Sequence, residues 1–266
     1  MPIDERPVTE WVAHIRPTVE ATLQNLPKGM PILRAEQAML PGIPEGERIT
    51  HLIDHTLLRT EYTPADVDRV CEEGLKYGFA SVCTNPIYVP QVVRRLQGSN
   101  TLPASIVGFL FGAEFPSIKV EQAKKLIEAG VREMDMVQAV GLLKAGRYAE
   151  VARDIQGVVD VCHRSGVLLK VILEVGLLEQ DEKIAGALIA QHVGADYVKT
   201  CTGFTQGEAT ADDIRLLRSI VGNDMGVKAA GGIRSYEKAI ELIRAGASRL
   251  GATQSVQIAE EARKIS

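Results

Sequence analysis

The chain has few cysteines and few aromatic residues, and the shortage of cysteine bears on where the protein works. Four cysteines occur among 266 residues, and aromatic side chains make up 5% of the chain. Cys71, Cys83, Cys162 and Cys201 show no metal-ligand spacing, and no apolar secretory segment precedes them. We therefore expect reduced thiols in a cytoplasmic protein.

Long apolar runs, an excess of positive charge and metal-ligand clusters are also missing. No segment is long enough and uncharged enough to cross a bilayer, so we expect no membrane association. The formal net charge of −4 and the isoelectric point of about 5.8 argue against a nucleic-acid-binding protein. The five histidines are scattered among other residue types, so we expect neither a metal nor another cofactor.

What the sequence does contain is a regular alternation of strand and helix patterns from Ile49 to the end. With 45% hydrophobic residues the chain can bury one large core, and a (β/α)8 barrel typically needs ~250 residues. The expected strands are His51–Thr56, Phe79–Cys83, Ser105–Phe109, Glu133–Val137, Leu168–Glu174, Tyr197–Thr200, Gly226–Ala229 and Ser248–Gly251. The expected helices are Thr63–Tyr77, Tyr88–Leu96, Ile118–Glu128, Tyr148–Arg164, Asp181–His192, Ala211–Val221, Tyr236–Arg244 and Ser255–Lys264.

Eight strand–helix units predict an α/β fold, a (β/α)8 TIM barrel over residues 49–266. The competing fold is an open, doubly wound sheet. That fold would need a G-x-G-x-x-G motif after the first strand, where this chain has Leu57-Leu58-Arg59. The barrel is therefore the better prediction.

Residues 1–48 form a separate N-terminal extension in this interpretation. Thr9–Leu26 is amphipathic at helical period, and we expect Pro17 to bend or split the helix. Pro27–Gly46 is rich in proline and glycine and is typical of a loop or linker. The helix either caps the bottom of the barrel or serves as a docking segment for a partner or an assembly.

A lysine in an apolar strand recurs in three successive units. Residues 195–204, ADYVKTCTGF, place Lys199 at the end of a short strand, and Lys170 and Lys228 each lie 29 residues away. A βαβ unit takes about 30 residues, so adjacent strands bring the three side chains together. Burial and neighbouring positive charge both lower the pKa of a lysine. A neutral lysine is a nucleophile toward carbonyls, whereas the ordinary alternative is a lysine that extends to the surface.

Other polar residues stand where the predicted strands end, which is where barrel enzymes carry their chemistry. The candidates from the first, second and fourth strands are Asp54, Thr56, Cys83 and Asp135. Asp135 is interpreted as a proton relay with Lys228, although both aspartates could instead serve only as partners of buried lysines. Cys83 is more typical of a small buried apolar residue than of a nucleophile.

Glycines in three of the loops, together with Thr253, predict a phosphate site. Thr253 follows the eighth strand, whereas Thr202, in the turn after Lys199, is a candidate for substrate binding. The glycines are Gly203, Gly231, Gly232 and Gly251. Glycine lets the backbone approach a phosphate closely, and the next helix N-terminus adds a favourable dipole. A simple tight turn is the alternative for the Gly231-Gly232 pair.

Seven segments in order resemble the deoxyribose-phosphate aldolase family, class I aldolases on a (β/α)8 barrel. They are IDHTLL (53–58), SVCTNP (81–86), EMDMV (133–137), LKVILE (169–174), DYVKTCTGF (196–204), VKAAGGIR (227–234) and ASRLGA (247–252). The resemblance implies that Lys199 is the Schiff-base lysine, that Lys228 tunes it and that Asp135 relays protons. It implies that Gly203, Gly231 and Gly232 face the phosphate. Asp54, Cys83 and Lys170 would line the site.

The resemblance also implies a reaction. The enzyme would cleave 2-deoxy-D-ribose 5-phosphate to acetaldehyde and D-glyceraldehyde 3-phosphate without a metal, in carbohydrate catabolism, as a homo-oligomer such as a dimer or tetramer. The sequence departs from the family pattern at Leu110, Gln138, Val175 and Gln254. Two alternatives therefore stay open. One is an aldolase for another phosphorylated sugar, such as a deoxyketose 1-phosphate, and the other is a phosphate-binding barrel with a structural or assembly role.

Overall fold

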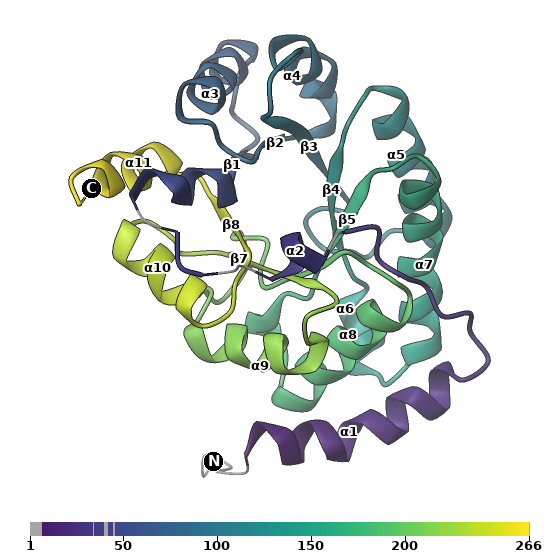
Figure 1. Cartoon of the computed structure of the whole chain (residues 1–266). Coiled ribbons are helices and arrows are strands. Elements are labelled where there is room, and N and C mark those ends of the chain that lie inside the picture. The colour runs from purple at the N-terminus through teal and green to yellow at the C-terminus, as the bar shows by residue number, and fades with distance from the viewer. Residues whose placement is uncertain (1–6, 34, 40–41, 45, 266) are drawn as a thin grey trace.

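The computed structural model describes residues 7–33, 35–39, 42–44 and 46–265. Within these residues, eight parallel strands pair in sequence order and close into a barrel, because β1 pairs with β8. The strands are β1 (Ile53–Leu57), β2 (Ser81–Thr84), β3 (Leu102–Val107), β4 (Glu133–Val137), β5 (Leu168–Ile172), β6 (Tyr197–Lys199), β7 (Gly226–Ala230) and β8 (Arg249–Ala252). Figure 1 looks along the barrel, with the helices arranged around it. The predicted TIM barrel is confirmed.

The outer ring consists of the helices that follow the eight strands. They are α3 (Pro64–Tyr77), α4 (Val89–Arg95), α5 (Pro116–Glu128), α6 (Val140–Lys144), α7 (Tyr148–Arg164), α8 (Gln180–His192), α9 (Ala211–Val221), α10 (Tyr236–Arg244) and α11 (Ser255–Arg263). The start and end of α3 follow from local chemistry. Thr63 and Asp66 form a reciprocal capping box, and Gly78 ends the helix with a φ of 65°.

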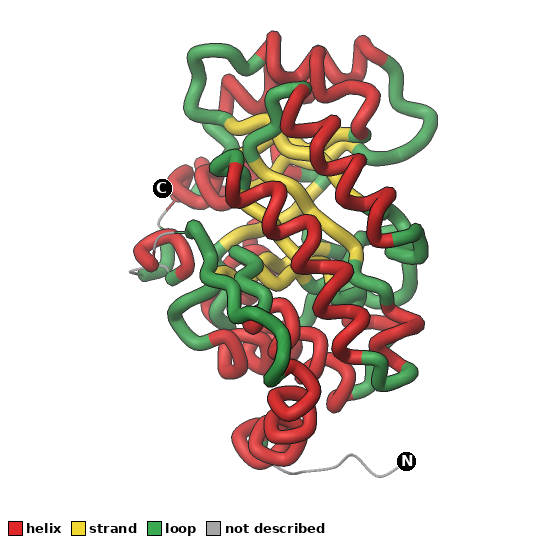
Figure 2. The backbone as a smooth tube through the Cα atoms, turned by 90° about the vertical axis from the view of Figure 1, so that its right-hand side faces the viewer, coloured by secondary structure: helices red, strands yellow, loops and turns green. Residues whose placement is uncertain are grey.

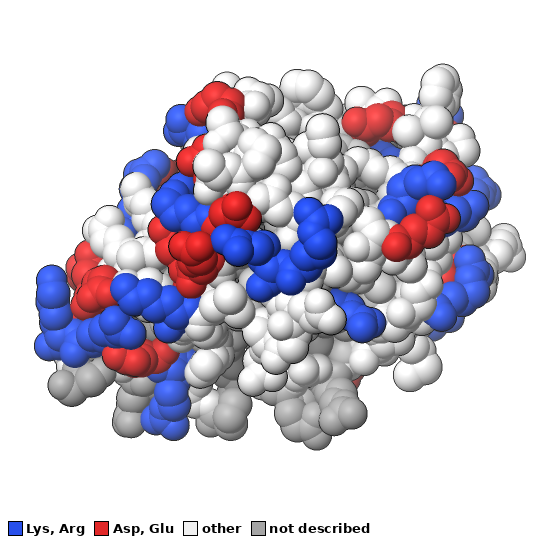
Figure 3. Space-filling view, turned by 90° about the horizontal axis from the view of Figure 1, so that it is seen from above, with Lys and Arg blue, Asp and Glu red and all other residues white. Residues whose placement is uncertain are grey.

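Ion pairs between exposed side chains join neighbouring helices of this ring. Arg95 of α4, for example, contacts Asp68 and Glu72 of α3 at 2.8 and 3.0 Å. Figure 3 shows the face above α3 and α4, where basic and acidic side chains are interspersed. Exposed pairs of this kind contribute little stability, about 0–1 kcal/mol each.

Several boundaries differ from the sequence prediction. β3 begins at Leu102 and ends before Gly108, whose φ of 62° takes the chain out of the extended conformation. β5 ends at Ile172, two residues before Glu174. The prediction missed α2 (Ala35–Ala38), α6 and the 3₁₀ helices η1 (Gly46–Leu52), η2 (Pro86–Tyr88) and η3 (Val175–Leu177).

The N-terminal helix α1 (Val8–Leu23) lies outside the barrel ring and packs on α7, α8 and α9. Val19 and Leu23 are fully buried there, and the helix is continuous through Pro17. Of the two outcomes expected for Pro17, a bend or a split, the split is therefore wrong. The apolar face is held by its packing against three helices, which offsets the hydrogen bond that proline removes.

The bottom of the barrel is covered by the segment after α1, and not by α1 itself. Asp196 accepts hydrogen bonds from the backbone N–H groups of Ile32 and Leu33, both at 2.8 Å. Arg218 donates to the carbonyl of Ala38 at 2.9 Å, and α2 contacts β7. Figure 1 shows α2 in front of the strands, and Figure 2 shows the adjoining loop at one end of the barrel. The predicted capping helix is therefore replaced by a hydrogen-bonded loop with one short helical turn.

Candidate functional site

Two lysines and one aspartate form the centre of the site. Lys199 and Lys228 are paired in register on β6 and β7. Their Nζ atoms lie 2.7 and 2.6 Å from the same carboxylate oxygen, Oδ2 of Asp135. Lys170 Nζ donates to the other oxygen of Asp135 at 3.2 Å. All four side chains come from neighbouring strands β4 to β7, so the 29-residue spacing did bring the lysines together.

A second group of charges lies directly beneath. Lys170 Nζ is 2.6 Å from Glu133, which also contacts the guanidinium of Arg249 at 2.9 Å. Arg249 reaches Asp54 at 2.7 Å, and Asp54 contacts Lys228 at 2.5 Å. We call the complete set the charge network. Its members are Asp54, Glu133, Asp135, Lys170, Lys199, Lys228 and Arg249.

Burial and these contacts lower the pKa of Lys199 and raise the pKa of the other two lysines. Burial lowers the pKa of Lys199, and the charge of Lys228 lowers it further, against the opposing effect of Asp135. Burial also disfavours the charged forms of Lys170 and Lys228, but the surrounding carboxylates outweigh it and raise the pKa of both. The three lysines likewise outweigh burial at Asp135 and lower its pKa. Lys199 is therefore the lysine that loses its proton most readily.

Cys83 is fully buried beside this centre. Burial, together with the charge of Asp135, raises the pKa of its thiol to about 12. It packs with Leu58, Ala104 and Ile106 in a small apolar cluster. The thiol is therefore protonated near neutral pH, which matches the interpretation of Cys83 as a small buried residue.

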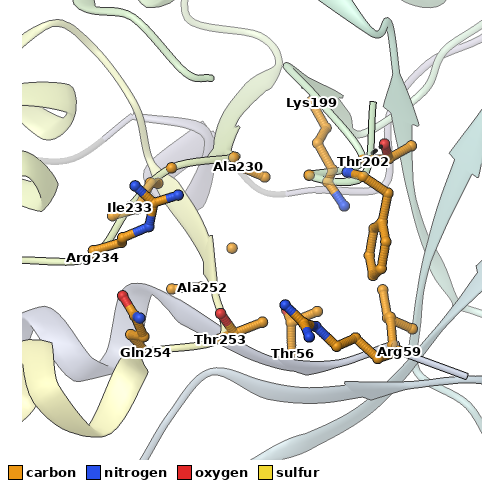
Figure 4. A pocket seen from close by; sticks show the side chains of 16 residues that line it. Thr56, Arg59, Lys199, Thr202, Ala230, Ile233, Arg234, Ala252, Thr253 and Gln254 are labelled. Atoms are coloured by element: carbon orange, nitrogen blue, oxygen red, sulfur yellow. Dashed lines mark hydrogen bonds between the residues drawn. The ribbon is translucent and has the colours of Figure 1, made fainter. Parts of the chain in front are cut away.

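The pocket above the charge network has a volume of about 360 Å³. Lys199 reaches it from one wall, and Figure 4 shows Thr56, Thr202 and Thr253 around the same space. Gly203, Gly231, Gly232 and Gly251 also line it. The structure thus gathers eight of the predicted residues around one pocket.

The other predicted residues lie below the pocket lining. Asp54, Cys83, Asp135, Lys170 and Lys228 are each at most 1% exposed. Asp54 and Lys170 are enclosed by the charged side chains of the network. Lys170 also sits lower than Lys199, because it pairs in register with Tyr197 of β6. The expectation that Asp54, Cys83 and Lys170 line the site therefore does not match this pocket.

The glycine loops form part of the wall of this pocket. Gly203, Gly231 and Gly232 have φ angles of 85°, 101° and 76°, a conformation that side chains rarely adopt. A Cβ atom on Gly232 would also lie 2.3 Å from the Glu208 side chain. Helix α11 begins next to this wall, at Ser255. These features provide backbone N–H groups and a helix dipole for an anion.

Three charged residues at the pocket and its loops were not among the predicted site residues. Arg59 and Arg234 line the pocket (Figure 4), and Arg234 pairs with Glu208 at 3.2 Å. Glu174 is buried, has a φ of 61°, and accepts the backbone N–H of Thr202 at 3.2 Å. The two arginines lie in the loops that follow predicted strands, which is the signal that could have found them.

The four departures from the family pattern lie in different places. Gln254 lines the pocket, next to Thr253. Gln138 is buried and donates to the carbonyl of Leu173 at 2.9 Å, and Val175 is buried in η3. Leu110 is partly exposed in the loop after β3. Of these four, Gln254 is therefore the residue placed to contact a ligand.

In the part of the chain that the structure describes, no group of three or more His, Cys, Asp or Glu side chains is arranged to hold a metal ion. None of the described helices is long and apolar enough to span a membrane.

Comparison with known proteins gives consistent matches. The model of the DeoC/LacD family aldolases matches residues 48–256. Deoxyribose-phosphate aldolase of Aciduliprofundum boonei is 45% identical over 216 residues, covering 81% of this chain and 97% of the relative. The enzyme of the same name from Thermococcus gammatolerans is 46% identical over 220 residues, with coverage of 82% and 98%.

Solved structures described as deoxyribose-phosphate aldolases are similar to this fold. The crystal structure of a putative deoxyribose-phosphate aldolase from Coccidioides immitis has a TM-score of 0.82 at 36% identity, covering 98% of this chain and 100% of that one. Deoxyribose phosphate aldolase from Aeropyrum pernix, described as a unique tetrameric structure, has a TM-score of 0.76 at 28% identity, with coverage of 92% and 96%.

Proposed function

This chain belongs to the DeoC/LacD family of aldolases, and we propose that it cleaves 2-deoxy-D-ribose 5-phosphate reversibly to acetaldehyde and D-glyceraldehyde 3-phosphate. The relatives that carry this name match most of the chain at about 45% identity. The alternatives of a deoxyketose phosphate substrate and of a purely structural barrel receive no support from them.

The observation that carries the proposal is the low proton affinity of Lys199 within a pocket lined by glycine loops. Its neutral amine attacks C1 of the open-chain sugar and forms a carbinolamine, which loses water to give a protonated imine. The C2–C3 bond then breaks, its electrons move into the imine to give an enamine, and the C3 hydroxyl loses a proton. Protonation at C2 and hydrolysis release acetaldehyde and restore Lys199.

Asp135 and Lys228 supply the proton transfers through a water molecule in this proposal. Asp135 lies 2.7 Å from Lys199 Nζ, so it can hold a proton next to the carbinolamine and the imine. Lys228 remains protonated, because its raised pKa reflects two carboxylate neighbours. Its positive charge keeps the amine of Lys199 neutral.

The phosphate group would occupy the part of the pocket that the glycine loops line. The loops there contain Gly203, Gly231 and Gly232, and Thr253 stands before the start of α11. Arg59 and Arg234 add positive charge at the same pocket. This arrangement would place the aldehyde carbon of the sugar at Lys199 and its phosphate group at the glycine loops.

Location, assembly and pathway complete the proposal. We expect a cytoplasmic, metal-independent enzyme of carbohydrate catabolism. The Aeropyrum pernix relative is described as tetrameric, so a homo-oligomer is the expected form. The apolar face of α1 packs on helices of its own barrel, which favours a structural role over a separate docking partner.

Borohydride trapping tests the proposed chemistry. Reduction in the presence of acetaldehyde or deoxyribose phosphate should add the corresponding mass to the peptide that contains Lys199. Lys199→Arg should prevent both labelling and turnover, because a guanidinium stays protonated in this pH range. A label on Lys170 or Lys228 would overturn the assignment. A deoxyketose 1-phosphate assayed in parallel should give much the slower turnover.

A further inference from the structure

The charge network divides into an upper and a lower part. The upper part is the trio Lys199, Lys228 and Asp135 next to the pocket. The lower part contains the pair Glu133–Arg249, joined by two hydrogen bonds of 2.9 and 3.2 Å. Neither member of this pair lines the pocket. The pair can therefore affect the reaction only through its charges and its contacts with other members of the network.

The number of charges in the network indicates what the lower pair does. The carboxylates of Asp54, Glu133 and Asp135 carry three negative charges. The cations of Lys170, Lys228 and Arg249 carry three positive charges, and the pKa of each of these three is raised. An unbalanced charge is costly in a buried environment. The network is neutral when Lys199 has no proton, so its charge composition favours the nucleophilic form.

The lower pair is connected to Lys199 through two routes of direct contacts. Glu133 contacts Lys170 at 2.6 Å, and Lys170 donates to Asp135, which contacts Lys199. On the other side, Arg249 contacts Asp54 at 2.7 Å. Asp54 contacts Lys228, which shares Asp135 with Lys199.

The groups that face these residues come from most of the barrel strands. The charged and titratable groups around Lys199 are Asp135 of β4, Lys228 of β7 and Cys83 of β2. Those around the lower pair are Asp54 of β1, Lys170 of β5 and Tyr197 of β6, whose ring lies 5.5 Å from the Arg249 guanidinium.

We propose that Glu133 and Arg249 are positioning residues, whose opposite charges set the protonation of Lys199 from beneath the pocket. The inference rests on the proposed function for the importance of a neutral Lys199. The effect itself belongs to the free protein and needs no substrate. Because the two residues carry opposite charges, removing one charge or the other must shift the titration of Lys199 in opposite directions.

The expected shifts follow from the sign of the charge removed. Glu133→Gln leaves an excess of positive charge, which lowers the pKa of Lys199. Arg249→Met leaves an excess of negative charge, which raises it. A unit charge acting across part of a protein interior should move the titration midpoint by about one pH unit in each case. The double variant restores the balance, and its midpoint should lie within a few tenths of a pH unit of the wild-type value.

Competitive labelling with acetic anhydride measures this without relying on catalysis. The full-length protein is labelled over a pH series, and mass spectrometry of the Lys199 peptide gives the titration midpoint. The matched control is Glu128→Gln, which removes the same charge from the exposed Lys125–Glu128 pair on α5 and should leave the midpoint unchanged. Shifts of the same sign, or no shift in either single variant, would overturn the proposal.

Two further variants cover the case in which a single variant does not fold. Glu133→Asp and Arg249→Lys keep the charges and should keep the wild-type midpoint. The double variant, which retains the charge balance, provides the same test, and a shifted midpoint in any of these three would contradict the proposal. Failure of the proposed function gives a different result: borohydride trapping labels another residue, whereas the labelling midpoints of Lys199 still shift as expected.

Discussion

Lys199 and Lys228 stand opposite each other on adjacent strands and share a single carboxylate oxygen, Oδ2 of Asp135, at 2.7 and 2.6 Å. Two ammonium groups on one oxygen would repel each other in a buried site. The arrangement favours the proton on Lys228, which has a second acid partner in Asp54 and a raised pKa, whereas burial and the charge of Lys228 lower the pKa of Lys199. The shared oxygen thus makes the two lysines chemically different.

Replacing Lys228 by leucine should raise the pKa of Lys199, because a neighbouring positive charge is lost. The acid limb of the kcat/KM profile should then move to higher pH. The rate loss should be largest near neutral pH, about tenfold for each unit of displacement. Lys183→Leu, which removes a lysine that pairs with Asp213 outside the network, should leave the profile in place. An unshifted profile in Lys228→Leu would count against the electrostatic role.

Asp135→Asn should reduce turnover strongly while still allowing an imine to form at Lys199. The variant loses the carboxylate that moves protons, so turnover should fall by at least ~100-fold. The amine of Lys199 loses an anion that favours its protonated form, so borohydride should still trap the aldehyde there. The control is Asp154→Asn, which changes a buried acid paired with Lys119 away from the pocket. Normal turnover in Asp135→Asn would rule out the relay.

Acid should destabilise the barrel through Asp54 and Asp135. The folded state lowers the pKa of both below the ordinary value of 3.8, against the cost of their burial. Their contribution to stability is therefore fully present above pH 3.8 and is lost as the pH falls toward their folded-state pKa values. Thermal unfolding followed from pH 6 to pH 2 should show a falling Tm below about pH 4. A Tm that is flat over this range would be inconsistent with the network.

The sequence predicted the barrel well because the signals were local and periodic. Capping residues such as Thr63 and Gly78 mark helix ends, and the 29-residue spacing of the lysines follows from the size of one βαβ unit. The upper part of the charge network followed from that spacing. The lowered pKa of Lys199 was also predictable from the sequence, since it needs only burial and neighbouring positive charge.

The lower part of the site could not be predicted from the sequence in the same way. Glu133 and Arg249 are 116 residues apart, and their contact depends on closure of the barrel. How far Lys170 lies below the pocket depends on the register between β5 and β6. That register pairs Lys170 with Tyr197 and not with Lys199. Glu174 reaches Thr202 only because its backbone adopts a φ of 61°, a conformation that few residues other than glycine adopt.

Removal of metals should leave the activity unchanged. The proposed chemistry uses lysine and aspartate, and the described residues offer no cluster of three metal ligands. Enzyme dialysed against EDTA should keep its turnover number within experimental error. Loss of activity that zinc restores would contradict the class I mechanism.

The anchor of the N-terminal segment should be important for stability and not for chemistry. Asp196 accepts hydrogen bonds from Ile32, Leu33 and Leu169, and contacts His163 at 2.9 Å. Asp196→Ala should therefore lower the free energy of unfolding by about 3 kcal/mol. The turnover number measured below the melting temperature should stay within a few-fold of wild type. Asp212→Ala, at an exposed position on α9, should change neither quantity.

The charge network also affects how such an enzyme can diversify. Four members of the network each contact at least two oppositely charged neighbours: Asp54, Glu133, Lys170 and Arg249. A neutral substitution at any one of them therefore leaves a buried charge on another without a partner. Gln254 is exposed and lies on a loop at the pocket. Selection can therefore alter the loops that line the pocket while the charge network stays fixed. Substitutions should therefore be tolerated more easily in the loops than in the interior of the barrel.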